Sequence, residues 1–505
     1  MVFDHIVSWV VFLPIVAIPL LWLIPRDKAK WLALAATLVD FVVALPLFLN
    51  FDKAAEGVND PNGMQFTEHV PWIMTKGMKI YYSIGVDGIS ISMILLTLII
   101  GVVAVLASWN IDKFQRGYFA MFLLLQGAML GVFVALDLIL FYLFWEVMLF
   151  PMYFLIGVWG GPRRIYAAIK FFLYTLLGSV GMLLAILAVW YYAPGAERTF
   201  DIIELLRRVN DGGTFEGPAI FGLPFVRVVF VAFFIGFAIK VPIFPFHTWL
   251  PDAHVEAPTA ISVILAGVLL KMGTYGFLRI NFPLFPETFD WFRDFFVALA
   301  VVNIVYGALC ALAQSDLKKM IAYSSVSHMG FVLLGIGAAT AQGMNGAVLQ
   351  MFNHGTITAM LFLLVGVVYD RAHHRRIAGF GGLAAVTPIY AAVTSIAYMA
   401  AIGLPGLSGF ISELLILTGA FKVYQIPTIL SGLGIILGAG YMLWAYQRIF
   451  FGKLNRDYKE LKEINFVELC SVVPLILIVL YLGVFPNTII VYFESSLNYL
   501  SRILI

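Results

Sequence analysis

The chain has 505 residues, of which 62% are hydrophobic and only 12% are charged, whereas soluble domains carry roughly 25% charged residues. This composition excludes a soluble globular fold and predicts a protein that crosses the lipid bilayer many times. The 31 basic and 29 acidic residues give a formal net charge of +2 and form no basic block, so nothing favours a nucleic-acid partner. We therefore expect the bilayer and other membrane proteins as partners.

Apolar runs of about 20 residues, the length needed to cross the hydrocarbon core, predict fourteen membrane helices. They lie near residues 6–24, 31–49, 84–108, 117–135, 137–159, 166–191, 225–250, 259–281, 294–313, 318–337, 343–370, 386–421, 426–450 and 467–491. Helix 7 is broken at 239–245, where Pro242 and Pro245 stand, and helix 12 is broken at 402–409 around Pro405. The two breaks lie five helices apart, an odd number, which indicates an inverted repeat.

The predicted fold is thus an all-α membrane protein of about 14 transmembrane helices with two inverted five-helix repeats. Residues 1–116 form helices 1–3 with an outer loop at 50–83, and 117–281 form the first repeat, helices 4–8. Residues 294–450 form the second repeat, helices 9–13, and 451–505 form a C-terminal loop and helix 14. Within the loop 192–224, the amphipathic segment 199–209 predicts a helix at the membrane surface.

The loops on one side of the predicted bundle carry seventeen lysines and arginines against ten on the other side. Because basic residues accumulate in cytoplasmic loops, both termini are expected on the outer side. Asp137 stands at the outer start of helix 5, where we expect it to cap the helix rather than to carry protons.

Among the ionisable side chains inside predicted spans, where a charge costs about 2.5–3.5 kcal/mol on insertion scales, two glutamates, two lysines and two histidines are the candidates for function. They are Glu146, Lys240, Lys271, His328, His354 and Glu413. A buried lysine beside a carboxylate can change its protonation as the pair forms and breaks, and a histidine can take a proton on one ring nitrogen and release it from the other. A static Glu146–Lys240 ion pair would leave four of the six unexplained, so the pattern favours a proton path. His328 could equally be a histidine satisfied by hydrogen bonds between helices.

The segment 245–258, PFHTWLPDAHVEAP, follows the break in helix 7 and is rich in ionisable and aromatic groups. Its histidines, His247 and His254, stand seven residues apart and so lack the i, i+4 spacing of a helical zinc site. A rigid re-entrant loop is one interpretation. Proton entry at the cytoplasmic mouth is favoured over a metal.

No redox cofactor is expected on this chain. Cys310 and Cys470 stand far apart in apolar runs and match neither a metal pair nor a disulfide framework. The sequence also lacks a dinucleotide-binding GxGxxG after a strand and a haem-attachment motif.

Two long motifs, KVPIFPFHTWLPDAHVEAP at 240–258 and DLKKMIAYSSVSHMG at 316–330, resemble the antiporter-like membrane subunits of the proton-pumping NADH:quinone oxidoreductase, respiratory complex I. The similarity extends over essentially the whole chain. It implies that Glu146 and Lys240 form a paired gate, that Lys271 is the central lysine, that His354 connects the two halves, and that Glu413 is the terminal residue towards the outer side. His328 and His247 are secondary candidates on the same path.

Glu413 stands where the related L and N subunits place a lysine, so the resemblance is greatest to the M group, the chain 4 type of mitochondria. It implies L and N neighbours, FMN and iron–sulfur clusters in partner subunits, and proton transfer coupled there to NADH oxidation and quinone reduction. The expected location is the bacterial inner membrane rather than the mitochondrial one. Multi-subunit sodium/proton antiporters share the core motifs and are the alternative. A stand-alone symporter would need a substrate-sized polar pocket, and a structural spacer would tolerate loss of the buried charges.

Overall fold

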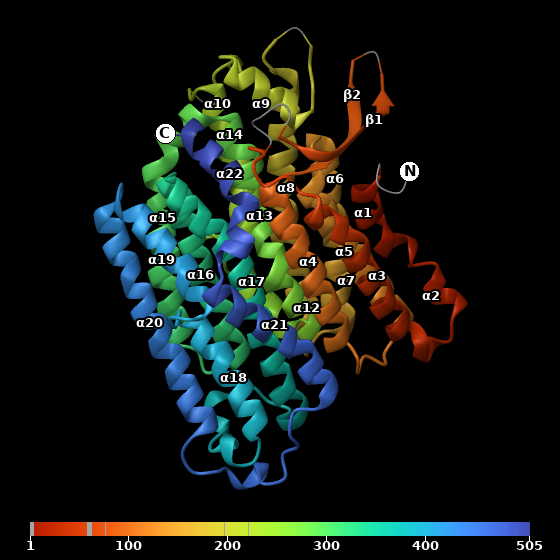
Figure 1. The fold of residues 1–505 in the computed structure, drawn as a ribbon, viewed down its shortest axis with the longest axis vertical. Coiled ribbons are helices and arrows are strands. Elements are labelled where there is room, and N and C mark those ends of the chain that lie inside the picture. The colour runs from red at the N-terminus through yellow and green to blue at the C-terminus, as the bar shows by residue number, and fades with distance from the viewer. Residues whose placement is uncertain (1–4, 58–62, 76, 196, 221, 505) are drawn as a thin grey trace.

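The computed structural model describes residues 5–57, 63–75, 77–195, 197–220 and 222–504 and forms an elongated bundle of helices with both ends of the chain towards the same end (Figure 1). Twelve helices in these ranges are long and apolar enough to cross a membrane, which confirms a multi-pass helical membrane protein. They are Ile6–Leu23 (α1 and α2), Arg26–Leu49 (containing α3, Ala29–Leu49), Gly88–Ala107 (α4), Gln115–Val134 (α5), Leu138–Trp159 (α6 and α7), Arg164–Tyr191 (α8), Thr259–Leu284 (α12 to α14), Pro286–Leu312 (α15), Leu317–Ala338 (α16), Ala341–Ala372 (α17), Gln425–Phe450 (α20) and Phe466–Val484 (α21).

The two segments expected to be broken are each built from two helices. The first pair is α10, Phe225–Lys240, and α11, Trp249–Glu256; the second is α18, Pro388–Ala401, and α19, Ser408–Phe421. Asn303 of α15 forms hydrogen bonds with backbone groups at the first break. Its side chain accepts from the Phe244 amide at 2.8 Å and donates to the Pro242 carbonyl at 3.2 Å. In the second break, Gly403 and Gly406 have φ angles of +73° and +92°, which glycine adopts without a steric penalty.

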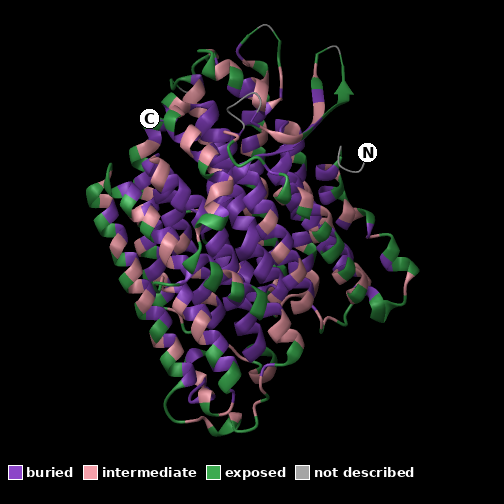
Figure 2. Ribbon diagram, viewed as in Figure 1, coloured by how far each residue is buried: buried purple, intermediate pink, exposed green. Residues whose placement is uncertain are grey.

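The helices at the centre of the bundle are shielded on all sides. In the most apolar stretches of Thr259–Leu284 and of α17 every residue is buried, whereas only a third are buried in those of Arg26–Leu49 and α20. Figure 2 shows this gradient as a buried core surrounded by partly exposed helices. Polar side chains on the central helices are therefore far from lipid and can find partners only inside the protein.

The chain contains a β-hairpin that the sequence analysis placed in a plain outer loop at 50–83. Strand β1, Gln65–Met74, pairs antiparallel with β2, Lys79–Val86. Strand β2 is buried along its inner half, since it lies against α4, α5 and α6. The membrane part is all-α as expected, but the loop expected at 50–83 contains this hairpin, which a search for apolar runs of about 20 residues does not detect.

The last apolar run, expected as one span at 467–491, ends earlier. Helix α21 stops at Val484, and a separate amphipathic helix, α22, runs over Asn487–Ile503 and packs on α4 and α17. By contrast, the predicted surface helix in the loop 192–224 is present as α9, Ile202–Asn210, with Ile202, Leu205 and Leu206 buried.

Asp137 caps the N-terminus of α6, Leu138–Val147, as expected. One carboxylate oxygen accepts from the amides of Ile139 and Leu140 at 2.9 and 3.2 Å, and the other accepts from the amide of Tyr81 in β2 at 3.3 Å. Burial raises the pKa of the Asp137 carboxyl to about 6 in spite of these hydrogen bonds. The cap thus joins the hairpin to the bundle at a group that titrates near neutral pH.

We predict that Asp137 makes the end of the bundle that carries the hairpin less stable as the pH rises. Its pKa of about 6 in the folded protein lies above the value of about 4 for an unfolded chain. The stabilising contribution is therefore complete below about pH 4 and is lost as the pH rises to about 6. Relative to Asp137→Asn, which keeps a capping oxygen but cannot ionise, wild type should lose up to about 3 kcal/mol across this window. Melting curves of both proteins at several pH values test this, and a constant difference would contradict it.

Candidate proton path

Lys271 and His354 are in direct contact at the centre of the bundle. The Lys271 Nζ atom lies 2.7 Å from His354 Nδ1, and the two residues are 0% and 2% exposed. Lys271 belongs to α13, Leu270–Gly276, which directly follows a π-helical turn, Leu265–Leu269. A π-turn leaves a backbone carbonyl without its usual helical partner, and Nζ also donates to the Ala266 carbonyl in that turn. The two predicted residues are therefore joined without an intervening water.

Glycines let the helices that carry Lys271 and His354 approach each other. A Cβ atom at Gly355 would lie 2.8 Å from the Gly267 carbonyl oxygen and 2.7 Å from the Leu96 side chain. Any larger residue would push α17 away from the π-helical turn. Gly355 thus makes room for the π-helical turn that precedes Lys271.

His328 and Glu413 form a second contact. His328 Nδ1 of α16 lies 3.0 Å from Glu413 Oε1 of α19, and Gln350 of α17 donates to the same oxygen at 3.4 Å. The serines beside His328 do not bind its ring, since Ser324 and Ser325 donate to the Ile321 carbonyl. Thus the partner of His328 is the carboxylate.

A small cavity lies between the two contacts. The ring centres of His328 and His354 are 5.9 Å apart, and both Nε2 atoms are buried without a hydrogen-bond partner among the described residues. Both rings line a cavity of about 10 Å³ together with Glu413 and Gln350, roughly the room for one water molecule. A single water there could join the two contacts into one chain.

Glu146 and Lys240 do not form the expected ion pair. No salt bridge joins them among the described residues, and neither Lys240 Nζ nor Glu146 Oε1 has a hydrogen-bond partner there. Lys240 Nζ instead lies over the rings of Trp145 and Phe171, at 5.2 and 5.7 Å from their centres. Lys240 is only 1% exposed. A static structural pair is therefore not what this conformation contains.

The two histidines after the break in α10 are buried in different places. His247 is surrounded by aromatic rings, with the centres of Tyr306 and Phe244 at 5.2 and 5.8 Å. His254 stacks on Phe362 at 4.5 Å. None of their four ring nitrogens has a hydrogen-bond partner in the part of the chain described. His247 is therefore not in contact with the chain from Lys271 to Glu413.

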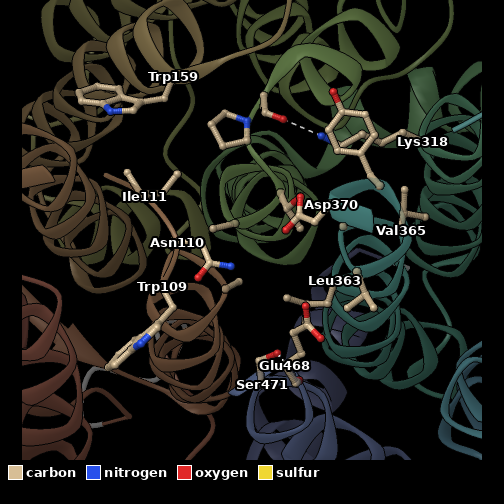
Figure 3. A pocket seen from close by; sticks show the side chains of 18 of the residues that line it. Trp109, Asn110, Ile111, Trp159, Lys318, Leu363, Val365, Asp370, Glu468 and Ser471 are labelled. Carbon is tan, nitrogen blue, oxygen red and sulfur yellow. Dashed lines mark hydrogen bonds between the residues drawn. The ribbon is translucent and has the colours of Figure 1, made fainter. Parts of the chain in front are cut away.

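A much larger cavity, of about 600 Å³, lies among loops and helix ends on one side of the bundle. Figure 3 shows Asp370, Glu468 and Lys318 around it, with Trp109 and Trp159 on the opposite wall. The Lys318 ammonium donates to the Ala257 carbonyl at 2.6 Å. Lys318 was not predicted as a site residue, because a lysine at a predicted helix start is ordinarily a surface residue.

Gln350 and Ser412 were also missed as members of the site. Ser412 donates to Gln350 Oε1, which orients the Gln350 amide towards Glu413. Their positions one turn from His354 and beside Glu413 gave a weak signal that polar spacing alone could not separate from helix packing.

A buried chain of proton-exchanging side chains inside a multi-pass helical bundle defines a membrane protein that transfers protons. The chain belongs to the NADH:quinone oxidoreductase/Mrp antiporter transmembrane family, whose pattern matches residues 135–438.

Similarity to individual proteins extends from end to end. The chain is 45% identical to NADH-quinone oxidoreductase subunit M of Rhodobacter capsulatus, over 96% of this chain and 94% of that protein. It is 39% identical to NADH-ubiquinone oxidoreductase chain 4 of Chondrus crispus, over 97% and 96%. A chain of respiratory complex I from Thermus thermophilus superposes with a TM-score of 0.86 at 32% identity, over 99% of both chains. The archaeal membrane-bound sulfane sulfur reductase shares the fold, with a TM-score of 0.80 at 23% identity over 94% of this chain and 75% of that one.

We predict that Gly355→Ala will lower both the stability of the protein and its proton transfer. The added methyl group must displace Leu96 or the π-helical turn, and overpacking of this kind costs about 1–3 kcal/mol. Gly117→Ala is the matched control, because its Cβ would meet only Trp159, at 4.0 Å. Melting temperature and proton transfer should both fall for the first variant and not for the second. Equal behaviour of the two variants would show that the close approach is unimportant.

Proposed function

We propose that this chain is the M-type proton-translocating membrane subunit of an NADH:quinone oxidoreductase. The observation that carries the proposal is the identity of 45% over 96% of the chain to a protein named as subunit M. The buried contacts from Lys271 to Glu413 supply the chemistry that such a subunit needs. The same similarity favours this function over a subunit of a multi-subunit sodium/proton antiporter.

In the proposed path, a proton passes from Lys271 to Glu413. Lys271 donates a proton to His354 Nδ1, and the ring releases one from Nε2, because both nitrogens of a histidinium carry a proton. A water in the small cavity carries the proton to His328, whose Nδ1 lies 3.0 Å from the Glu413 carboxylate. Glu413 then releases it towards the outer side. The support for this path is the series of contacts that links Lys271 to Glu413.

Protons would reach Lys271 from the large cavity. Its lining comes from loops and helix ends on the side with the excess of basic residues, which we assign to the cytoplasm. His254 belongs to α11, which packs on α16, the helix that carries Lys318. We infer that Lys318 and His254 lead from the cavity to Lys271. Glu146 and Lys240 act beside this entry as the gate, with His247 at the break in its helix.

The partners follow from the same proposal. The related L and N subunits lie on either side of the chain, and FMN and iron–sulfur clusters are carried by partner subunits. This chain itself holds no redox group, and energy reaches it through changes in conformation or electrostatic field. The host membrane is the bacterial inner membrane, with both termini on the periplasmic side. Intact fractionation of membranes tests the assignment: the chain should travel with flavin and iron–sulfur subunits, and travel with an antiporter assembly instead would overturn it.

Glu413→Gln is predicted to reduce proton pumping per NADH several-fold in an intact complex. Glutamine keeps the size and hydrogen bonding of glutamate but cannot ionise, so it can still contact His328 without accepting its proton. Glu413→Asp should retain part of the function. Pumping is measured from the acidification that accompanies NADH oxidation by closed vesicles. A Gln variant that assembles and pumps at the wild-type rate would contradict a role in release.

Lys240→Ala and Glu146→Ala should each lower coupled pumping, since each change leaves the other group buried without a charge to respond to. Lys79→Ala is the control, because Lys79 is an exposed lysine whose partner, Glu197, is also exposed. The measurement compares proton yield per NADH after assembly has been verified on native gels. Normal proton yields per NADH in both buried variants would show that Glu146 and Lys240 are not a gate in the proposed path.

A further inference from the structure

A further buried carboxyl group lies outside the proton path, in the middle of α3. Asp40 is the only ionisable residue between Lys30 and Asp52, and its side chain is 0% exposed. The opposite face of α3 is open, with Val39 and Val42 exposed by 50% and 60%. Asp40 therefore points into the protein from a helix at the boundary with lipid or a neighbouring subunit.

The only hydrogen-bond partner of Asp40 in the described chain is Gln126 of α5. Gln126 Nε2 donates to Asp40 Oδ2 at 2.9 Å. The other two oxygens of this pair, Asp40 Oδ1 and Gln126 Oε1, are both buried without a partner. If Asp40 is ionised, both of these atoms are acceptors, and neither can satisfy the other.

No positive charge neutralises Asp40 within the described residues. The elements packed on α3 are α1, α4, α5, and the turn Arg26–Lys28. Helices α1 and α4 carry no ionisable side chain. The charged groups on the others are Arg26, Asp27, Lys28 and Arg116, to which Lys30 of α3 itself is added. Lys30 and Arg116 stand ten residues before Asp40 and Gln126, about 15 Å along a helix axis.

The Gln126 amide is held in place by α4. A Cβ atom at Gly101 would lie 2.5 Å from Gln126 Oε1, so the amide fills the space that this glycine leaves. The amide therefore occupies a confined space against α4, with its Nε2 within hydrogen-bond distance of the Asp40 carboxyl group.

We propose that Asp40 is a second, separate protonation site and that it holds a proton at rest. The proton on Oδ1 is donated to Gln126 Oε1, while Gln126 Nε2 donates to Oδ2. Two hydrogen bonds then close a ring that satisfies all four polar atoms and fixes α3 to α5. Loss of the proton leaves a negative oxygen facing the amide oxygen and opens the ring, so the attachment of α3 depends on this proton.

Infrared spectroscopy of the intact complex tests the proposal, because the carbonyl stretch of a protonated carboxylic acid is separate from the bands of carboxylates and amides. Wild type should have one acid band more than Asp40→Asn at about pH 6 and at about pH 9. In Gln126→Leu the band should remain but move to higher frequency, since the carbonyl has lost the Nε2 donor. Identical acid bands in wild type and Asp40→Asn would overturn the protonated state, and an unmoved band in Gln126→Leu would overturn the ring.

Wild-type complex grown with carbon-13 in the aspartate carboxyl groups provides a test without any substitution. An acid band that shifts with the isotope is expected, and the absence of any such band overturns the proposal even if both variants fail to assemble. Recorded at about pH 9, where Asp137 with its pKa of about 6 is ionised, the labelled spectrum reports protonated aspartates rather than a rate, so the outcome is independent of the proposed pumping function.

Discussion

The structure depends on the contact between Lys271 and His354, because it places two ionisable groups side by side in the buried centre of the bundle. A lysine in such a place is costly unless polar atoms replace its hydration shell. Here the π-helical turn supplies the Ala266 carbonyl and α17 supplies the His354 ring nitrogen. The fold is arranged around this need, with the two most deeply buried helical segments, Thr259–Leu284 and α17, meeting at this point.

The same constraint explains why the helices in this region are irregular. A regular helix uses all of its carbonyls and presents only side chains to its neighbours. The π-helical turn before Lys271, the proline break after Lys240 and the glycine break before Glu413 each free backbone groups or space beside an ionisable residue. Irregular backbone is tolerated at membrane depth only where protein surrounds it. Each irregularity therefore identifies a place where a charge must be accommodated.

Much of this arrangement could be predicted from the sequence. The long apolar runs gave the class of fold, and the proline and glycine clusters gave the two breaks, since both signals are local. Lys271, His354, His328 and Glu413 were found because charge is rare inside an apolar span. The contacts between them could not be predicted, because Lys271 and His354 are 83 residues apart in the chain. The β-hairpin was missed because it lies outside the long apolar runs that were used to find membrane helices.

Asp40 shows where rarity of charge failed as a guide. Like the six candidate site residues, Asp40 stands in an apolar run. It was counted only as part of the second predicted span, because a single aspartate near one end of the chain belongs to no motif. Gln126 was not recognised as a partner of Asp40 from the sequence, because a glutamine side chain is neutral. Only the geometry of the pair, with two partnerless oxygens in one amide–carboxyl contact, distinguishes it.

The ionisable groups from Lys271 to Glu413 are connected to one another, whereas Glu146 and Lys240 are not. This difference bears on how proton transfer could be controlled. From Lys271 to Glu413 each gap is a hydrogen bond or the width of one water. Glu146 and Lys240, in contrast, have no polar contact with each other, and an aromatic side chain lies beside the lysine. In the proposed path, the contacts from Lys271 to Glu413 are already connected, which leaves the pair that is still apart, Glu146 and Lys240, as the proposed point of control.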